Sequence, residues 1–130
     1  MRGEPMNEEL QRENAKNSAV EIVKILDSKK AADLKLLCVR ELTPLADYFV
    51  ICTANSTTQL RSLADEVEFK MKTEHANEPR GIEGKDGWIL IDFGNVIVHV
   101  FTVEAREFYK LDKLWADAEN VDISEFTEIE

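Results

Sequence analysis

The sequence is poor in the residues that build disulfides, metal sites and phosphate-binding loops. Its 130 residues include two cysteines, two histidines and five glycines. Cys38 and Cys52 both lie inside apolar runs, the usual place for reduced core thiols in a cytosolic protein, and a disulfide would require their strands to be neighbours. Because the cysteines and histidines are widely separated in the sequence, no metal-ligand spacing is present. We therefore expect no metal site and no cofactor.

The sequence also lacks long apolar runs and a positive net charge. No run approaches the roughly 20 apolar residues of a membrane helix, and no basic leader with an apolar centre is present. We therefore expect no membrane contact, no signal peptide and a cytoplasmic location. The net charge of −10 would repel a phosphate backbone, which argues against direct nucleic-acid binding. The same charge would speed the encounter with a basic protein.

The remaining composition indicates one globular domain. Hydrophobic residues make up 44% and charged residues 32% of the chain, which is typical of a folded protein rather than a disordered one. One-sided apolar spacing predicts helices over 8–29 and 55–75, and one or two short helices over 104–118. Ser56 and Gln59, at the start of the second helix, have the form of a capping box.

Alternating or continuous apolar runs predict about five strands, and hence an α/β domain whose helices cover a sheet. In chain order, the expected strands are 34–39, 47–54, 80–83, 88–93 and 96–102. The run at 47–54 is apolar on both faces, which predicts a central strand covered on both sides. The last two strands are expected to form a hairpin. We expect the domain to end near residue 118 and residues 119–130 to form a flexible acidic tail.

Asp47 and Asp92 are the first candidates for chemistry, because paired carboxylates hold divalent metals or act as acid and base. Neither has a second carboxylate two residues away, and each lies where a strand begins or ends. His99 lies in an apolar run without a nucleophile on its face, which favours packing over a base role. The segment 53–58 precedes a helix but lacks the glycines of a phosphate loop, so capping by Ser56 explains it.

Four further residues, Trp88, Arg106, Tyr109 and Trp115, are candidates for binding a protein partner. Aromatic and Arg side chains dominate protein–protein hot spots because they bury a large area and keep a polar end. Core packing is the alternative, and it fits Trp115 as well as binding does. Trp88 begins its strand directly after a turn-rich segment, where an exposed indole would indicate a partner site.

Several segments, taken in order, resemble the ribosomal silencing factor family, also called the Iojap-related family. The segments are "ADYFVICTANSTTQLRSLAD" (46–65), "EG" (83–84), "GWILIDFGNVIVHVF" (87–101) and "REFYKLDKLW" (106–115). The similarity extends from about residue 16 to 117, and the residues after 118 lie beyond the shared pattern. Asp112 is a departure, because the family usually has Glu there, but the charge is kept.

The resemblance implies a nucleotidyltransferase-like fold with a mixed sheet and flanking helices, but no enzymatic activity. It implies a bacterial protein that binds the large ribosomal subunit through the fourteenth large-subunit protein, blocks joining of the small subunit and represses translation during nutrient limitation. It also implies that the chain forms homodimers in isolation. The family's binding surface maps onto Asp47, Tyr48, Trp88, Asp92, Arg106, Tyr109 and Trp115.

Three hypotheses follow from the sequence. The first is a steric inhibitor of ribosomal subunit association. The second is a nucleotidyltransferase-like enzyme in which Asp47 and Asp92 hold magnesium and Ser56 lies near a phosphate. The third is that the main interface is the homodimer itself, formed by exposed apolar surface.

Overall fold

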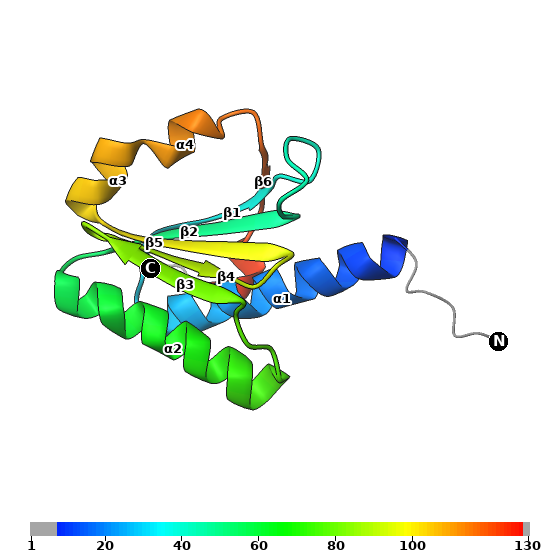
Figure 1. The fold of residues 1–130 in the computed structure, drawn as a ribbon, viewed down its shortest axis with the longest axis horizontal. Coiled ribbons are helices and arrows are strands. Elements are labelled where there is room, and N and C mark those ends of the chain that lie inside the picture. The colour runs from blue at the N-terminus through cyan, green and yellow to red at the C-terminus, as the bar shows by residue number, and fades with distance from the viewer. Residues whose placement is uncertain (1–7, 129–130) are drawn as a thin grey trace.

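The computed structural model describes residues 8–128, which form a six-stranded sheet flanked by helices (Figure 1). The helices are α1 (Glu8–Ser28), α2 (Thr57–His75), α3 (Val103–Tyr109) and α4 (Leu111–Leu114), with a short 3-10 helix η1 (Ser124–Phe126). The strands are β1 (Ala32–Cys38), β2 (Tyr48–Ala54), β3 (Gly81–Lys85), β4 (Trp88–Asp92), β5 (Val96–Thr102) and β6 (Glu119–Val121). Residues 1–7 and 129–130, which the predicted domain and tail include, lie outside this range.

The sheet is mixed, with the strand order β3-β4-β5-β2-β1-β6. β2 and β5 pair in parallel from Tyr48↔Val96 to Ala54↔Thr102, and the other neighbours pair antiparallel. Every residue of β2 is buried, as expected for a strand covered on both faces. The prediction of a central strand near 47–54 and of an α/β fold is therefore confirmed.

Helices α1 and α2 lie together under one face of the sheet (Figure 1). Their apolar stripes, centred on Ile22 and Leu63, pack against alternate residues of the strands. This main core contains Ala19, Ile22, Val23, Leu26, Leu36, Tyr48, Val50, Cys52, Leu60, Leu63, Val67, Met71, Ile91, Val98 and Val100. None of the helices within residues 8–128 is long and apolar enough to cross a bilayer.

The predicted capping box starts α2, with one difference in its second bond. The Gln59 amide N–H donates to Ser56 Oγ at 3.0 Å. The Gln59 side-chain oxygen accepts from the Asn55 amide at 2.6 Å, one residue before the cap rather than at the cap itself. The hydroxyl-rich turn after β2 is thus used to begin the helix, as capping predicts.

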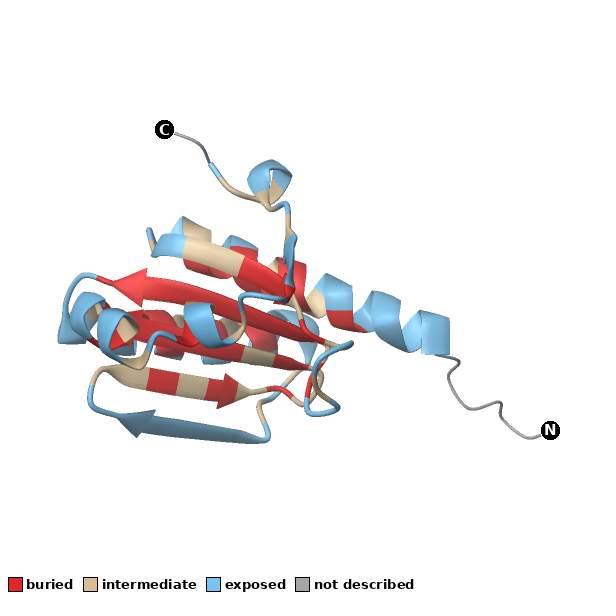
Figure 2. Ribbon diagram, turned by 90° about the horizontal axis from the view of Figure 1, so that it is seen from above, coloured by how far each residue is buried: buried red, intermediate tan, exposed pale blue. Residues whose placement is uncertain are grey.

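Helices α3 and α4 cross the opposite face of the sheet and cover only part of it, as the view from above shows (Figure 2). Under them lies a second core, formed by Leu37, Val39, Ala46, Phe49, Ile51, Phe101, Ala105, Leu111 and Ala118. Trp88, Ile97, Tyr109 and Trp115 pack against this second core and stay partly exposed. The two faces of the sheet are therefore covered unequally.

The segment expected to be a flexible tail is instead part of the described fold. Residues 119–121 form β6, which pairs antiparallel with β1 and adds a sixth strand to the expected five. Ile123 and Phe126 pack against the main core, and Lys24 Nζ lies 5.9 Å from the centre of the Phe126 ring. The expectation rested on composition, which registers the acidic residues but not the three spaced apolar ones, Val121, Ile123 and Phe126.

Ending the chain at Ala118 should therefore lower its stability. The truncation exposes the β1 edge and the apolar surface under Val121, Ile123 and Phe126, and each fully buried side chain of this size contributes about 1.5–3 kcal/mol. Because these three are only partly buried, we expect a loss of about 2–4 kcal/mol in urea unfolding. The exposed substitution Glu125→Gln is the control, and an unchanged midpoint for the truncated chain would contradict the prediction.

Candidate partner-binding face

The uncovered part of the second sheet face, called the open face below, is the candidate functional site. On the β4–β5 hairpin it presents the partly exposed side chains of Trp88, Leu90, Asp92 and Ile97. Tyr109 of α3 and Trp115, directly after α4, border it through ring contacts with Trp88 and Phe49 respectively. Aromatic and aliphatic groups that are half covered within their own chain still offer apolar area to a partner.

Trp88 is placed by a turn that only glycine accommodates well. Gly87 has φ +83°, and a Cβ there would lie 2.6 Å from Thr102 Oγ1. That hydroxyl is needed at its position, because it accepts from the Ala105 amide and caps α3. The Gly87 carbonyl in turn accepts from the Thr102 amide at 2.8 Å. Gly87 therefore brings the start of β4 and the start of α3 close together.

The indole of Trp88 is packed against two other aromatic rings rather than free. Its ring centre lies 4.8 Å from that of Tyr109 and 5.0 Å from that of Phe101. Its Nε1–H donates to His99 Nδ1 at 3.2 Å. Trp88 is thus both a support of the second core and a partly exposed group of the open face. Core packing and partner binding were expected as alternatives for Trp88, whereas its side chain has contacts in the second core and also stays partly exposed.

His99 lies beneath the open face with 3% of its surface exposed. The Phe49 ring meets it edge-on at 4.7 Å, and its Nδ1 accepts from Trp88, so the neutral ring carries its proton on Nε2. Nε2 is buried without a hydrogen-bond partner within residues 8–128. Burial lowers the pKa of His99 to about 4. The packed role that the sequence favoured for His99 agrees with these contacts.

Arg106 points inward and ties α3 and α4 to the sheet. Its Nε and Nη2 donate to the two carboxylate oxygens of Asp112 at 3.1 and 2.9 Å. Its Nη1 donates to the Asp33 carbonyl at 2.7 Å and to Thr53 Oγ1 at 2.8 Å. Lys35 Nζ lies 2.9 Å from the same Asp112 carboxylate. Hydrogen bonds from Arg106, followed by those from Lys35, hold the pKa of Asp112 well below its usual range.

No pattern in the sequence indicated the β1 residues that complete this Arg106 network. β1 has an irregular register between Ala32 and Lys35, and Asp33 there has φ +46°. A bulge leaves one residue out of the ladder, which explains why the Asp33 carbonyl is available to Arg106. Arg106 was expected at the surface as a partner-binding residue, but only 13% of its side chain is exposed and its hydrogen bonds are internal.

Asp47 and Asp92 are each engaged by an arginine. Asp47 Oδ1 lies 3.6 Å from Arg40 Nε, and Asp92 Oδ2 lies 3.4 Å from Arg80 Nη2. Asp92 Oδ1 also accepts from the Gly94 amide at 2.7 Å and so fixes the hairpin turn. Within residues 8–128, no three His, Cys, Asp or Glu side chains gather as metal ligands. Both carboxylates therefore have structural positions, Asp47 before β2 and Asp92 at the end of β4. These are the strand-end positions that were expected as the alternative to a chemical role.

Tyr48 is separated from the other predicted partner-binding residues. It is 5% exposed and belongs to the main core, on the α1 and α2 side of the sheet. Arg40 lies over its ring at 5.4 Å. Trp88, Asp92, Tyr109 and Trp115 are brought together at the open face or its border, whereas Tyr48 and Arg106 are not. Strand alternation puts Tyr48 and Phe49 on opposite faces, but the face that Tyr48 shares with other strands depends on their pairing.

The fold and this face define the class of protein. It is an α/β protein whose sheet is well covered on one side and presents aromatic and aliphatic groups on the other. A family model described as "Ribosomal silencing factor during starvation" matches residues 12–130. The chain therefore belongs to the ribosomal silencing factor family. The match also covers the residues after 118, which were expected to lie beyond the shared pattern.

Individual relatives agree with this assignment. The chain is 39% identical over 103 residues to ribosomal silencing factor RsfS of Halalkalibacterium halodurans, which covers 78% of this chain and 87% of that protein. It is 34% identical over 101 residues to "Mitochondrial assembly of ribosomal large subunit protein 1" of mouse, covering 72% of this chain and 43% of that protein. A crystal structure of a Chromobacterium violaceum protein superposes with a TM-score of 0.70 at 31% identity, covering 80% of this chain and 85% of the other.

Replacing Arg106 by Ala should destabilise the protein strongly. The change leaves Asp112, the Asp33 carbonyl and Thr53 without their donor, and breaking a partly buried ion pair on one side costs about 2–4 kcal/mol. Urea unfolding measures the loss. Arg12→Ala, which removes an exposed ion pair with Glu8 on α1, should cost less than about 0.5 kcal/mol. Equal losses for the two variants would contradict the assigned role of Arg106.

The buried His99 predicts a stability that falls with acid. The unfolded chain protonates this ring near pH 6.5, whereas the folded chain resists protonation down to about pH 4. Stability is therefore full above pH 6.5 and declines as the pH drops toward 4, by up to about 3 kcal/mol from this group. His99→Phe should flatten the unfolding free energy between pH 6.5 and 4.5, whereas His75→Gln on the surface should not. If the unfolding free energy of His99→Phe still falls between pH 6.5 and 4.5, other groups cause the loss of stability.

Proposed function

We propose that this chain is a silencing factor that docks its open face on the large ribosomal subunit. The partner is the fourteenth large-subunit protein, at the surface that meets the small subunit, and occupancy of that surface keeps the subunits apart. The observation that carries the proposal is the half-covered hairpin of β4 and β5, with Trp88, Leu90 and Ile97 directed away from the main core. The names of relatives, which refer to ribosome silencing and large-subunit assembly, support the ribosome as the target.

The physical mechanism requires no chemistry. Burying the remaining exposed area of the aromatic and aliphatic side chains supplies affinity, while a rigid sheet lowers the entropy lost on docking. The chain's net charge of −10 draws it toward a basic ribosomal protein and repels it from the surrounding RNA, so charge orients the encounter. Arrest of translation under starvation then follows from blocked subunit joining alone.

The enzyme alternative receives no support from the arrangement of its proposed residues. Asp47 and Asp92 are each bound to an arginine, and Ser56 serves as the cap of α2. A magnesium site for nucleotidyl transfer needs carboxylates that converge on one ion. We therefore infer a binding role rather than a catalytic one.

Leu90→Arg tests the open face directly. Leu90 is partly exposed and belongs to neither core cluster, so the fold should tolerate the change. A long basic side chain there would prevent close docking and repel a basic partner, and we expect at least a tenfold weaker affinity for large subunits in co-sedimentation, about 1.4 kcal/mol. Gln11→Arg adds the same charge to an exposed site on α1. Undiminished binding by the folded Leu90→Arg protein would refute the assigned face.

A functional assay separates binding from silencing. Purified large and small subunits are mixed with saturating wild-type protein, and the formation of whole ribosomes is followed in sucrose gradients. Wild-type protein should suppress joining, and Leu90→Arg should restore it. Normal joining at saturation would overturn the steric mechanism. Mass measurements with and without the ribosomal protein would show whether a second copy of the chain competes for the same face.

A further inference from the structure

The opposite end of the sheet from β6 has an edge that the proposed function does not use. β3 is the outermost strand on that side, and all five of its residues are exposed. It pairs antiparallel with β4 from Gly81↔Asp92 to Lys85↔Trp88. Its outer side has no neighbouring strand within residues 8–128. An exposed edge of this kind offers its backbone groups to another chain.

The hydrogen-bond alternation shows which backbone groups face outward. Thr102 donates to the Gly87 carbonyl and Phe93 donates to the Val96 carbonyl, so odd-numbered residues of β4 bond to β5. The backbone groups of Trp88 and Leu90 therefore point to β3, where they face Lys85 and Glu83. It follows that Ile82 and Gly84 direct their N–H and C=O groups away from the sheet.

This edge lacks the usual protection on its α2 side. Natural edge strands are blunted by proline, bulges or charged side chains. The charged side chains of β3, Glu83 and Lys85, share the face of Leu90 and Trp88. On the α2 side the strand presents only Ile82, which is 44% exposed, and Gly84, which has no side chain. On the α2 side, an added strand would therefore meet no charged side chain of β3.

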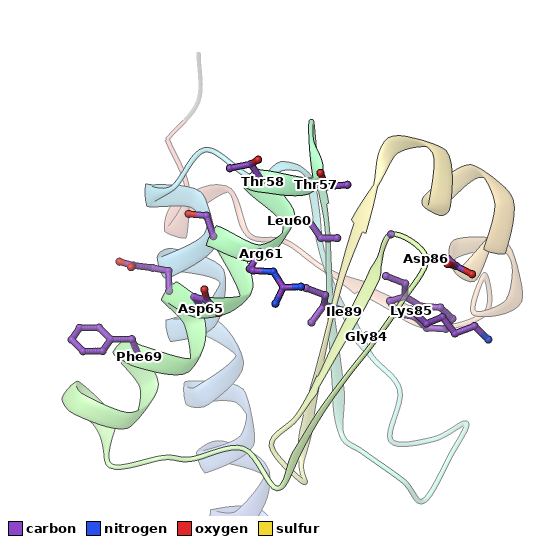
Figure 3. Close-up of a pocket in the computed structure, with 14 residues that line it drawn as sticks. Thr57, Thr58, Leu60, Arg61, Asp65, Phe69, Gly84, Lys85, Asp86 and Ile89 are labelled. Atoms are coloured by element: carbon purple, nitrogen blue, oxygen red, sulfur yellow. The ribbon is translucent and has the colours of Figure 1, made fainter.

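A groove of about 1050 Å³ lies beside this edge, between α2 and the β3–β4 hairpin (Figure 3). Leu60 and Ile89 contribute apolar atoms to it, and Phe69 of α2 stands 61% exposed at one end. Side chains on one face of an added strand would enter this groove. The edge and the groove together thus match an extended polypeptide, which needs backbone partners and room for alternate side chains.

The charges of the groove select the kind of segment. On the α2 side of the groove, the two carboxylates of Asp65 and Glu66 outnumber the one guanidinium of Arg61, which extends toward Ile89 (Figure 3). Lys85 and Asp86, on the far side of the hairpin, offset each other, and the whole chain has a net charge of −10. We propose that β3 and the α2 groove accept an extended, basic segment of a partner polypeptide, which adds to the sheet as a further strand. This surface is distinct from the open face, and the proposal stands independently of the ribosomal target.

The probe is a fluorescein-labelled eight-residue peptide of alternating Val and Lys, and the readout is fluorescence polarisation with the full chain. Ile82→Pro removes an outward N–H and leaves the β3–β4 ladder intact, because that N–H does not face β4. We expect at least a tenfold loss of affinity relative to Ile82→Val, which keeps the donor. Gly84→Pro is a second variant with the same expectation, and circular dichroism confirms that each variant is folded.

Charge is tested separately from strand addition. Asp65→Lys with Glu66→Lys should weaken binding of the Val–Lys peptide at least fivefold, and a Pro–Lys peptide of equal charge, which cannot form a ladder, should not bind.

Equal affinity of Ile82→Pro and Ile82→Val would overturn strand addition. Equal binding of a Val–Glu peptide would overturn the basic assignment. If the unmodified chain forms dimers and Ile82→Pro dissociates them, a second copy of this chain occupies the β3 edge. That result would overturn the proposed partner. Leu90→Arg should bind the peptide normally, which distinguishes this surface from the open face.

Discussion

The parallel pairing of β2 with β5 is the constraint on which the rest of the structure depends. It places two strongly apolar strands side by side at the centre of the sheet, with every residue of β2 buried. Such strands require cover on both faces, because their side chains alternate between the two. Helices α1 and α2 cover most of one face and leave the β3 edge exposed. The other face is covered by two short helices that follow β5 directly, and these are too small to cover the whole hairpin.

The Arg106 network determines where that limited cover lies. Four hydrogen bonds from one guanidinium join α3 and α4 to β1 and β2, so the helices lie over Phe101 and Ile51 and leave the β4–β5 hairpin partly open. A buried ion pair of this type is seldom a large net source of stability, but breaking it is costly, and it specifies one arrangement. The candidate partner-binding face thus exists because Arg106 fixes its border, although Arg106 itself does not reach the surface that a partner would touch.

The molecule offers two surfaces of different physical character. The open face presents aromatic and aliphatic side chains over a rigid second core and is suited to a folded partner with a matching apolar patch. The β3 edge presents backbone donors and acceptors beside a groove and is suited to an extended chain. The acidic charge of the whole protein favours basic partners at both. Strand β4 pairs with β3 on one side and with β5 on the other, and therefore contributes to both surfaces.

The sequence determined the elements and the alternation of side chains within them. Local spacing placed the helices, the central strand and the hairpin, and it assigned Trp88, Leu90 and Asp92 to one face, because periods of 3.6 and 2 residues are local properties. The resemblance of ordered segments identified the family. Composition failed for the residues after 118, since three spaced apolar side chains pair and pack only when β1 and α1 are already in place.

Tertiary structure alone decided which predicted residues meet. Arg106 and Trp88 looked equivalent in the sequence, but Arg106 turns inward to Asp33 and Thr53, whereas Trp88 stays partly exposed beside His99. Tyr48 went to the main core because strand order placed α1 beneath it. Such outcomes depend on contacts between residues far apart in the chain, such as Arg106 with Asp33. No local pattern encodes them, because their energy exists only after the sheet has formed.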